Sequence, residues 1–191
     1  MNNIDKFTKT NIGGVFMINL NAKERMLLED EKAHEELCVK KYQDYAKKVE
    51  DPALQTLFNE LSQKEQQHLD SINQMLNGTV PNVNQQQGQQ QAQQQPQQSM
   101  SSLTNNSGQS MINVGNMSAN PQITSTYNDH DKLLCQDALS TEKYVSSTYN
   151  TAIFEFKDKN IRQVLNHIQK EEQEHGEKIY NYMSQHGMYN A

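Results

Sequence analysis

The chain contains no tryptophan, only two cysteines and four prolines, and few hydrophobic residues for its length. Hydrophobic residues occupy 34% of the 191 positions, whereas soluble domains contain about 45–50% by a count that includes glycine. Cys38 and Cys135 are too few for a disulfide framework, and no Cys-x-x-Cys pair is present to bind zinc. No apolar run approaches the roughly 20 residues of a membrane span, so we expect no transmembrane helix.

The charge balance is acidic, with 23 acidic and 17 basic side chains and a net charge of −6. Because no basic patch is present, we expect no nucleic-acid partner. The N-terminal 20 residues carry acidic and polar side chains where a signal peptide needs an unbroken apolar stretch. We therefore expect synthesis in the cytoplasm without a signal peptide.

The shortage of hydrophobic residues is concentrated in one block. From Ser71 to Asn128 there is no Asp, Glu, Lys, Arg or His, and Gln fills 11 of the 14 positions from Gln85 to Gln98. Such a segment cannot bury enough apolar surface to offset its conformational entropy, so we predict a disordered linker at 77–128. A passive crossover is favoured over prion-like association of this linker.

Helix start and stop signals divide the rest of the chain into two helical pairs. Asn21 and Glu24 have the spacing of a capping box, and Asp51 is a favoured N-cap before a proline at the first helical position. No convincing strand alternation occurs outside short linker pieces, so we predict an all-α fold. The predicted segments are a mobile arm at 1–20, a helix pair at 21–76, the linker at 77–128 and a helix pair at 129–191, with both pairs in one bundle.

An internal repeat relates the two helix pairs. Shifting the sequence by 107 positions aligns 27–76 with 134–183 without a gap, and ten of the fifty aligned positions are identical. Each half contains the pattern Glu-x6-Tyr-x22-Glu-x2-His. The residues of this pattern are Glu35, Tyr42, Glu65 and His68 in the first half, and Glu142, Tyr149, Glu172 and His175 in the second.

The repeated polar residues lie on the apolar faces of their helices. Seven residues turn an α-helix by about 700°, so each Glu and Tyr of Glu-x6-Tyr share a face, and Glu-x2-His spans one turn. In the second helix of each predicted pair, the 3–4 spacing of apolar residues continues through the Glu and His positions. We therefore expect four carboxylates and two imidazoles to face one core.

Two divalent cations would account for this buried polar group. Burying unpaired charge is costly, and no Lys or Arg occupies an apolar-face position to neutralise the carboxylates. Oxygen-rich ligands with two imidazoles suit iron or manganese better than zinc or copper. We predict that two Fe or Mn ions are bound, and that two tyrosines hold ligand carboxylates in place. The predicted ligands are Glu35, Glu65, His68, Glu142, Glu172 and His175, and the supporting tyrosines are Tyr42 and Tyr149.

Two alternatives stay open at this point. The Glu and His side chains would also suit a wet groove in a loosely packed bundle, or the remnant of a metalloprotein that no longer binds metal. Glu31 is expected at an amphipathic helix edge rather than as an extra ligand. Both cysteines are interpreted as small core residues. The remaining histidines lack repeat partners and are expected in solvent; they are His34, His130, His167 and His186.

The two-repeat plan resembles the ferritin-like superfamily, including bacterioferritin and rubrerythrin, in which Glu-x6-Tyr and Glu-x2-His recur in this order. The C-terminal half resembles the coat F family of spore coat proteins, although Gly-Met-Tyr stands where family members usually have Gly-Trp-Tyr. The coat F likeness rests on Asp131-Lys-Leu-Leu, Thr141-Glu-Lys-Tyr144, Tyr149-Asn150, Glu171-Glu-Gln-Glu-His175, Tyr182-Met183 and His186-Gly-Met-Tyr189. These resemblances imply a ferritin-like four-helix bundle, a spore-forming Bacillota source, and a place in the spore coat or outer spore layers.

Two functions from different classes follow. The first is a spore coat component with a candidate dinuclear metal site, which has other coat proteins or a second copy of itself as partners. The second is a catalase-like di-iron or di-manganese oxidoreductase that acts on peroxide or oxygen in spore protection. Enzymatic activity is left open, with a non-enzymatic role preferred. Iron storage ranks last, because the long linker would obstruct the packing of a cage.

Overall fold

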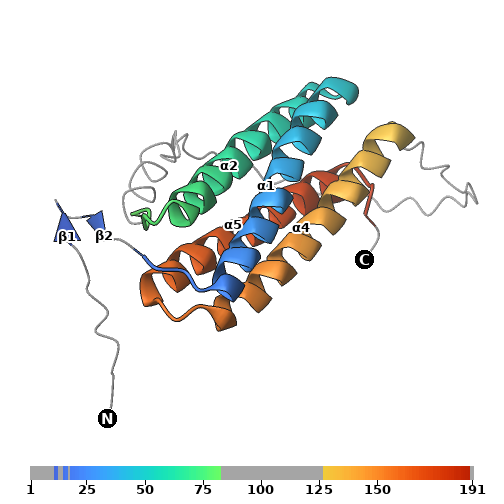
Figure 1. Ribbon diagram of the computed structural model, residues 1–191. Helices are drawn as coiled ribbons and strands as arrows, with labels where there is room; N and C mark the ends of the chain where they lie inside the picture. The colour runs from blue at the N-terminus through green and yellow to red at the C-terminus, as the bar shows by residue number, and fades with distance from the viewer. Residues whose placement is uncertain (1–10, 13–14, 17, 83–126, 190–191) are drawn as a thin grey trace, which may run out of the picture. The chain divides into compact units, whose positions relative to one another are not determined.

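A computed structural model describes residues 11–12, 15–16, 18–82 and 127–189. Four long helices lie side by side in it (Figure 1). They are α1 (Ala22–Lys48), α2 (Pro52–Leu76), α4 (Asp129–Glu155) and α5 (Lys159–Gln185). The predicted all-α ferritin-like bundle is confirmed. The Gln-rich part of the predicted linker and most of the predicted N-terminal arm lie outside the described residues.

Each helix begins at a polar cap that the sequence indicates. Asn21 and Glu24 form the predicted capping box, with Glu24 N donating to Asn21 Oδ1 at 3.0 Å and Asn21 N donating to Glu24 Oε2 at 2.9 Å. Asp51 and Asp158 accept from the first-turn amides of α2 and α5, and Asn128 does the same for α4. These caps satisfy amides that have no partner within the helix.

Glycines end α2 and α5. Gly78 has φ 86° and Gly187 has φ 69°, the left-handed region that residues with a Cβ rarely adopt. The turn after α2 also receives the N-terminal segment, because Ile18 N donates to Gly78 O at 2.9 Å. This hydrogen bond joins the segment before α1 to the turn after α2.

One element departs from the sequence prediction. Two short antiparallel strands, β1 (Asn11–Ile12) and β2 (Val15–Phe16), pair within the segment that was expected to have no strand. The sequence between them is Gly-Gly, a dipeptide that favours two-residue hairpin turns. Two residues per strand are too few to show the alternation on which strand prediction depends.

The order of the helices around the bundle is α1, α2, α5, α4, because each of these neighbours packs on the next and α4 packs on α1. The cross-pair contacts run antiparallel: Lys23 meets Glu155 near one end of α1, and Lys41 meets Asp137 near the other. The helices enclose one apolar core in which Phe58 stacks on Tyr42 with ring centroids 5.8 Å apart. This arrangement directs one face of every helix toward the same central axis.

Candidate metal centre

All six predicted ligands are buried in the middle of the bundle, each with 2% or less of its surface exposed. The helices α1 and α4 each contribute one glutamate, and α2 and α5 each contribute a Glu-x2-His pair. The i, i+3 spacing places each Glu and His one above the other on the inward face of its helix. The structure therefore brings together Glu35, Glu65, His68, Glu142, Glu172 and His175.

The six side chains form two overlapping groups. In one group Glu35 and His68 lie with Glu65 and Glu172, and in the other Glu142 and His175 lie with the same two glutamates. Within each group, one ligand atom from every residue lies within 4.8 Å of the others. Glu65 and Glu172 are thus common to both groups and lie between the two pairs.

The histidines direct Nδ1 toward glutamates of the opposite helix pair. His68 Nδ1 lies 2.7 Å from Glu172 Oε1, and His175 Nδ1 lies 2.9 Å from Glu65 Oε1. The two imidazole rings are stacked, with centroids 5.4 Å apart and an interplanar angle of 19°. The sequence repeat is therefore reproduced as a near-symmetrical pair of half-sites.

Two buried tyrosines cross between the helix pairs. Tyr42 of α1 donates its hydroxyl to Glu142 Oε1 on α4, and Tyr149 of α4 donates to Glu35 Oε1 on α1. Each tyrosine therefore holds the glutamate of the other repeat rather than the glutamate seven residues before it. The Glu-x6-Tyr motif puts both side chains on one face, but only the antiparallel packing of α1 on α4 decides the partner.

Several buried polar atoms of the centre have no hydrogen-bond partner. These are Glu35 Oε2, Glu142 Oε2 and Glu172 Oε2; the short contacts of His68 Nδ1 with Glu172 Oε1 and of His175 Nδ1 with Glu65 Oε1 lack hydrogen-bond alignment. Leaving such atoms unsatisfied costs about 1–3 kcal/mol each, and more where the group is charged. Among the described residues, no Lys or Arg forms a salt bridge with any of the six. The donor set of carboxylates and imidazoles fits iron or manganese, which would satisfy these atoms.

Burial shifts the pKa values of the glutamates in the centre. Burial raises the pKa of Glu35 to about 8, and burial together with the nearby Glu65 charge raises the pKa of both Glu142 and Glu172. Burial acts in the same direction on Glu65, but its contacts with His175 and His68 outweigh it and lower the Glu65 pKa. Without cations, burial therefore favours the protonated forms of Glu35, Glu142 and Glu172.

Sequence reasoning missed Glu171, which supports the outer side of His68. Glu171 is buried, and its Oε2 lies 3.0 Å from His68 Nε2. Burial acts to raise the Glu171 pKa, but the contact with His68 lowers it to about 2. His167 lies 3.4 Å from Glu171 and is only 12% exposed in its side chain, so the expectation that it is solvated was wrong. The position aligned with Glu171 in the first half is Lys64, so the repeat gave no signal for it.

Glu31 also differs from its predicted edge position. It is 2% exposed, and its Oε2 accepts from Thr148 Oγ1 at 2.9 Å and lies 3.2 Å from His34 Nδ1. The close packing of α1 on α4 buries this helix edge. Cys38 and Cys135 are buried free thiols, which agrees with their interpretation as core residues.

Comparison with known proteins places this bundle in a family. The sequence matches the Rubrerythrin family over residues 27–138, a stretch that includes most of α1, all of α2 and the start of α4. The chain belongs to the rubrerythrin family. Residues 130–191 match the Coat F domain, which covers nearly all of α4 and all of α5. The second helix pair of this rubrerythrin-family chain is thus the part that matches the Coat F domain.

The chain is also similar to the uncharacterized protein YusN of Bacillus subtilis (strain 168). The two are 37% identical over 77 residues, which are 38% of this chain and 68% of YusN. No solved structure matches the chain. Within the residues that the structure describes, no helix is long and apolar enough to cross a membrane.

Proposed function

We propose that this chain is a spore coat component whose ferritin-like bundle binds two iron or manganese ions. Glu35 and His68 would hold one ion, Glu142 and His175 would hold the other, and Glu65 and Glu172 would contact both. The observation that carries this proposal is the pair of overlapping carboxylate–histidine groups, in which one buried oxygen each of Glu35, Glu142 and Glu172 has no hydrogen-bond partner. The Coat F match supports the location in the coat, with other coat proteins as partners.

The chain's own residues would prepare the centre for cations. Tyr42 and Tyr149 orient the two glutamates that do not belong to Glu-x2-His pairs, and Glu171 fixes the ring of His68. Such outer contacts set the orientation and basicity of the ligands. Bound iron or manganese would supply one-electron redox chemistry and Lewis acidity.

A second candidate function is that of an oxidoreductase acting on peroxide or oxygen. The observation that favours it is a solvent-open pocket of about 560 Å³ between α4 and α5, with Glu142 and Glu172 among its lining residues. A purely structural metal site needs no such opening, whereas a reacting site does. A gas-evolution assay with hydrogen peroxide on the metal-loaded protein separates the two functions.

Metal content tests the shared claim. After anaerobic loading with ferrous or manganous ions, we expect elemental analysis to find two ions per chain, one for each group. The double variant Glu65→Gln/Glu172→Gln removes both shared carboxylates with little change in volume, and we expect it to lose both ions. Glu174→Gln is the matched control, because Glu174 is two residues away on α5 and pairs with Lys170 on the surface. Less than about 0.2 ions per wild-type chain would refute the site, since a centre of this kind binds metal tightly.

Coat location is tested separately in a spore-forming host. We expect an antibody against the chain to detect it in the extracted coat fraction and not in the spore core. A chain found only in the core would contradict the coat assignment without affecting the metal claim.

A further inference from the structure

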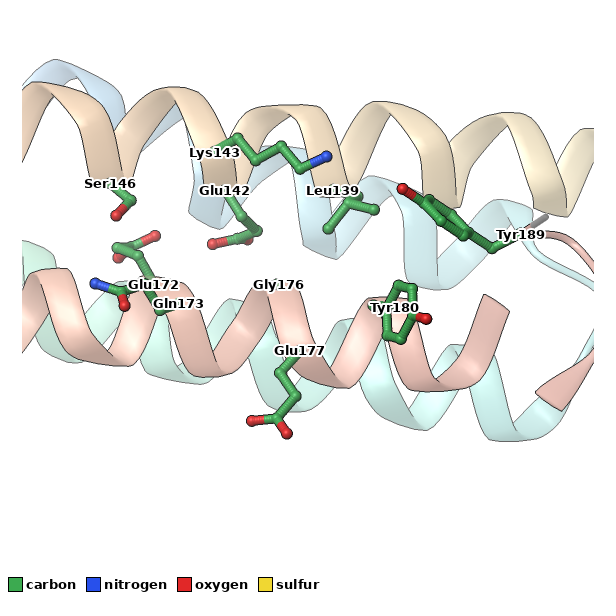
Figure 2. A pocket seen from close by; sticks show the side chains of 10 residues that line it. All are labelled: Leu139, Glu142, Lys143, Ser146, Glu172, Gln173, Gly176, Glu177, Tyr180 and Tyr189. Atoms are coloured by element: carbon green, nitrogen blue, oxygen red, sulfur yellow. The ribbon is translucent and has the colours of Figure 1, made fainter. Parts of the chain in front are cut away.

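The pocket between α4 and α5 reaches the candidate metal centre from one side (Figure 2). Glu142 and Glu172 point toward each other across it, and neither Glu142 Oε2 nor Glu172 Oε2 has a hydrogen-bond partner. Tyr180 and Tyr189 lie at one end, with their rings in edge contact at 5.0 Å between centroids. Solvent-open space therefore meets ligand atoms that are themselves almost completely buried.

Two small residues on the pocket wall keep this space open. At Gly176, an added Cβ would lie 3.6 Å from Glu142 Cβ and 3.7 Å from Leu139 Cδ1, both ordinary contact distances. Any larger side chain at this position would therefore extend into the pocket beside Glu142. Ser146 on α4 also lines the pocket and is only partly buried.

The aligned positions of the first repeat carry large apolar residues instead. Subtracting 107 from Gly176 and Ser146 gives Leu69 and Val39, and both of these are buried. The six ligand positions obey the repeat, whereas the two positions that make the opening break it. The ligands of the centre are thus nearly symmetrical between the two repeats, but the residues around them are not.

We propose that small exogenous ligands with an oxygen or nitrogen donor, of the size of azide or peroxide, reach the metal centre through an access portal between α4 and α5. The portal is formed by Gly176, Ser146, Glu142 and Glu172. It leads to the half of the centre that contains Glu142 and His175, and Leu69 and Val39 close the corresponding approach between α1 and α2. This inference rests on the proposed metal binding.

Kinetics distinguish an access route to the metal centre from a ligand-binding site in the pocket. Narrowing a route slows association and dissociation by the same factor and leaves the equilibrium constant unchanged, because the bound and free states are the same. Filling a ligand-binding site instead weakens binding itself and raises the Kd. Azide is a suitable probe, because its binding to ferric centres changes the visible absorbance and can be followed by stopped-flow mixing.

The test uses the full chain loaded with ferrous ion and oxidised in air, with iron content measured for every variant. In Gly176→Leu we expect azide association and dissociation each to slow about tenfold or more, with the Kd within about threefold of wild type. Gly176→Ala is the control for helix propensity, since its Cβ makes only ordinary contacts and leaves most of the pocket open. Ser146→Val copies the first repeat and should slow exchange in the same way.

The pseudo-symmetry provides a rescue. Adding Leu69→Ala to Gly176→Leu opens the approach between α1 and α2, and we expect azide exchange to recover toward the wild-type rates. A merely structural effect of Gly176→Leu would not be reversed by a second large-to-small change on another helix.

The outcomes are separable. Iron-loaded Gly176→Leu with wild-type azide exchange rates overturns the portal, and so does a raised Kd with unchanged association. If Gly176→Leu fails to retain iron, Ser146→Val decides by the same criteria. A wild-type chain that binds no iron or manganese overturns the proposed function and the portal together, and elemental analysis shows this before any azide is added.

Discussion

The hydrogen bonds that cross between α1 and α4 give the sharpest test of the centre. Tyr149→Phe removes the hydroxyl that donates to Glu35, and Tyr42→Phe removes the one that donates to Glu142. A hydrogen bond to a charged group contributes about 1.5–3 kcal/mol. Loss of an outer contact to a metal ligand typically lowers metal affinity about 10- to 100-fold, which corresponds to about 1.4–2.7 kcal/mol. The two magnitudes agree, so we expect each single variant to bind metal 10- to 100-fold more weakly, as a consequence of that one lost contact.

Tyr45→Phe is the matched control for this experiment. Tyr45 is on α1 as well, and its hydroxyl donates to a carboxylate, Asp137 Oδ2, at 2.6 Å, but this contact is exposed and outside the centre. We expect Tyr45→Phe to change metal affinity by less than about twofold, as for an ordinary surface contact. Affinity is measured by competition with a chromophoric chelator, with circular dichroism as the check of folding.

Two results would refute the reasoning. Tyr42→Phe and Tyr149→Phe with wild-type affinity would show that the tyrosines do not support ligands. Equal losses in all three variants would show a general effect on the bundle rather than on the centre.

Three further predictions concern the core, the pH dependence and the outer shell. Phe58→Ala should destabilise the protein by about 3–5 kcal/mol, measured by urea unfolding, because Phe58 is fully buried and stacks on Tyr42. The Glu35 pKa is raised to about 8 in the folded chain, so its proton is bound more tightly in the folded state than in the unfolded state. Its contribution to stability is then complete below about pH 4.3 and lost as the pH rises toward 8. In chelator-treated protein, the free energy of unfolding should fall from pH 5 to pH 8. Glu35→Gln should make this fall smaller, and bound metal should reverse it. A free energy of unfolding that rises with pH in the metal-free protein would contradict the prediction. Glu171→Gln should weaken metal binding about tenfold by loosening His68, and chelator competition that finds no change would remove Glu171 from the outer shell.

Most of the fold followed from local signals in the sequence. The caps at Asn21, Asp51, Asn128 and Asp158 each depend on a residue and the amides within three positions of it, so the sequence alone locates the helix starts. The same holds for Gly187, whose positive φ ends α5. The ligand positions were accessible because polar residues interrupt two apolar faces at the same places in both repeats.

The remaining features depend on which helices become neighbours. The sequence shows that Tyr42 shares a face with Glu35, but its actual acceptor is Glu142, 100 positions away. Glu31 is buried because α1 packs closely on α4, and periodicity within one helix cannot show this. Glu171 has no counterpart in the first half, so a search for repeated motifs passes over it. The opening at Gly176 is visible in the sequence only as a mismatch with Leu69, and its meaning requires the pocket.

The exchange of tyrosine donors between the two helix hairpins, α1–α2 and α4–α5, has a consequence for assembly. Glu35 receives its hydroxyl donor from the second hairpin, and Glu142 receives its donor from the first. Neither hairpin by itself therefore contains a finished half of the centre, and each completes the other. A chain that had only one such hairpin would have to pair with a second copy of itself, α1 against α1, to make the same contacts. The two helix pairs of this protein, produced separately, should likewise restore the centre on mixing.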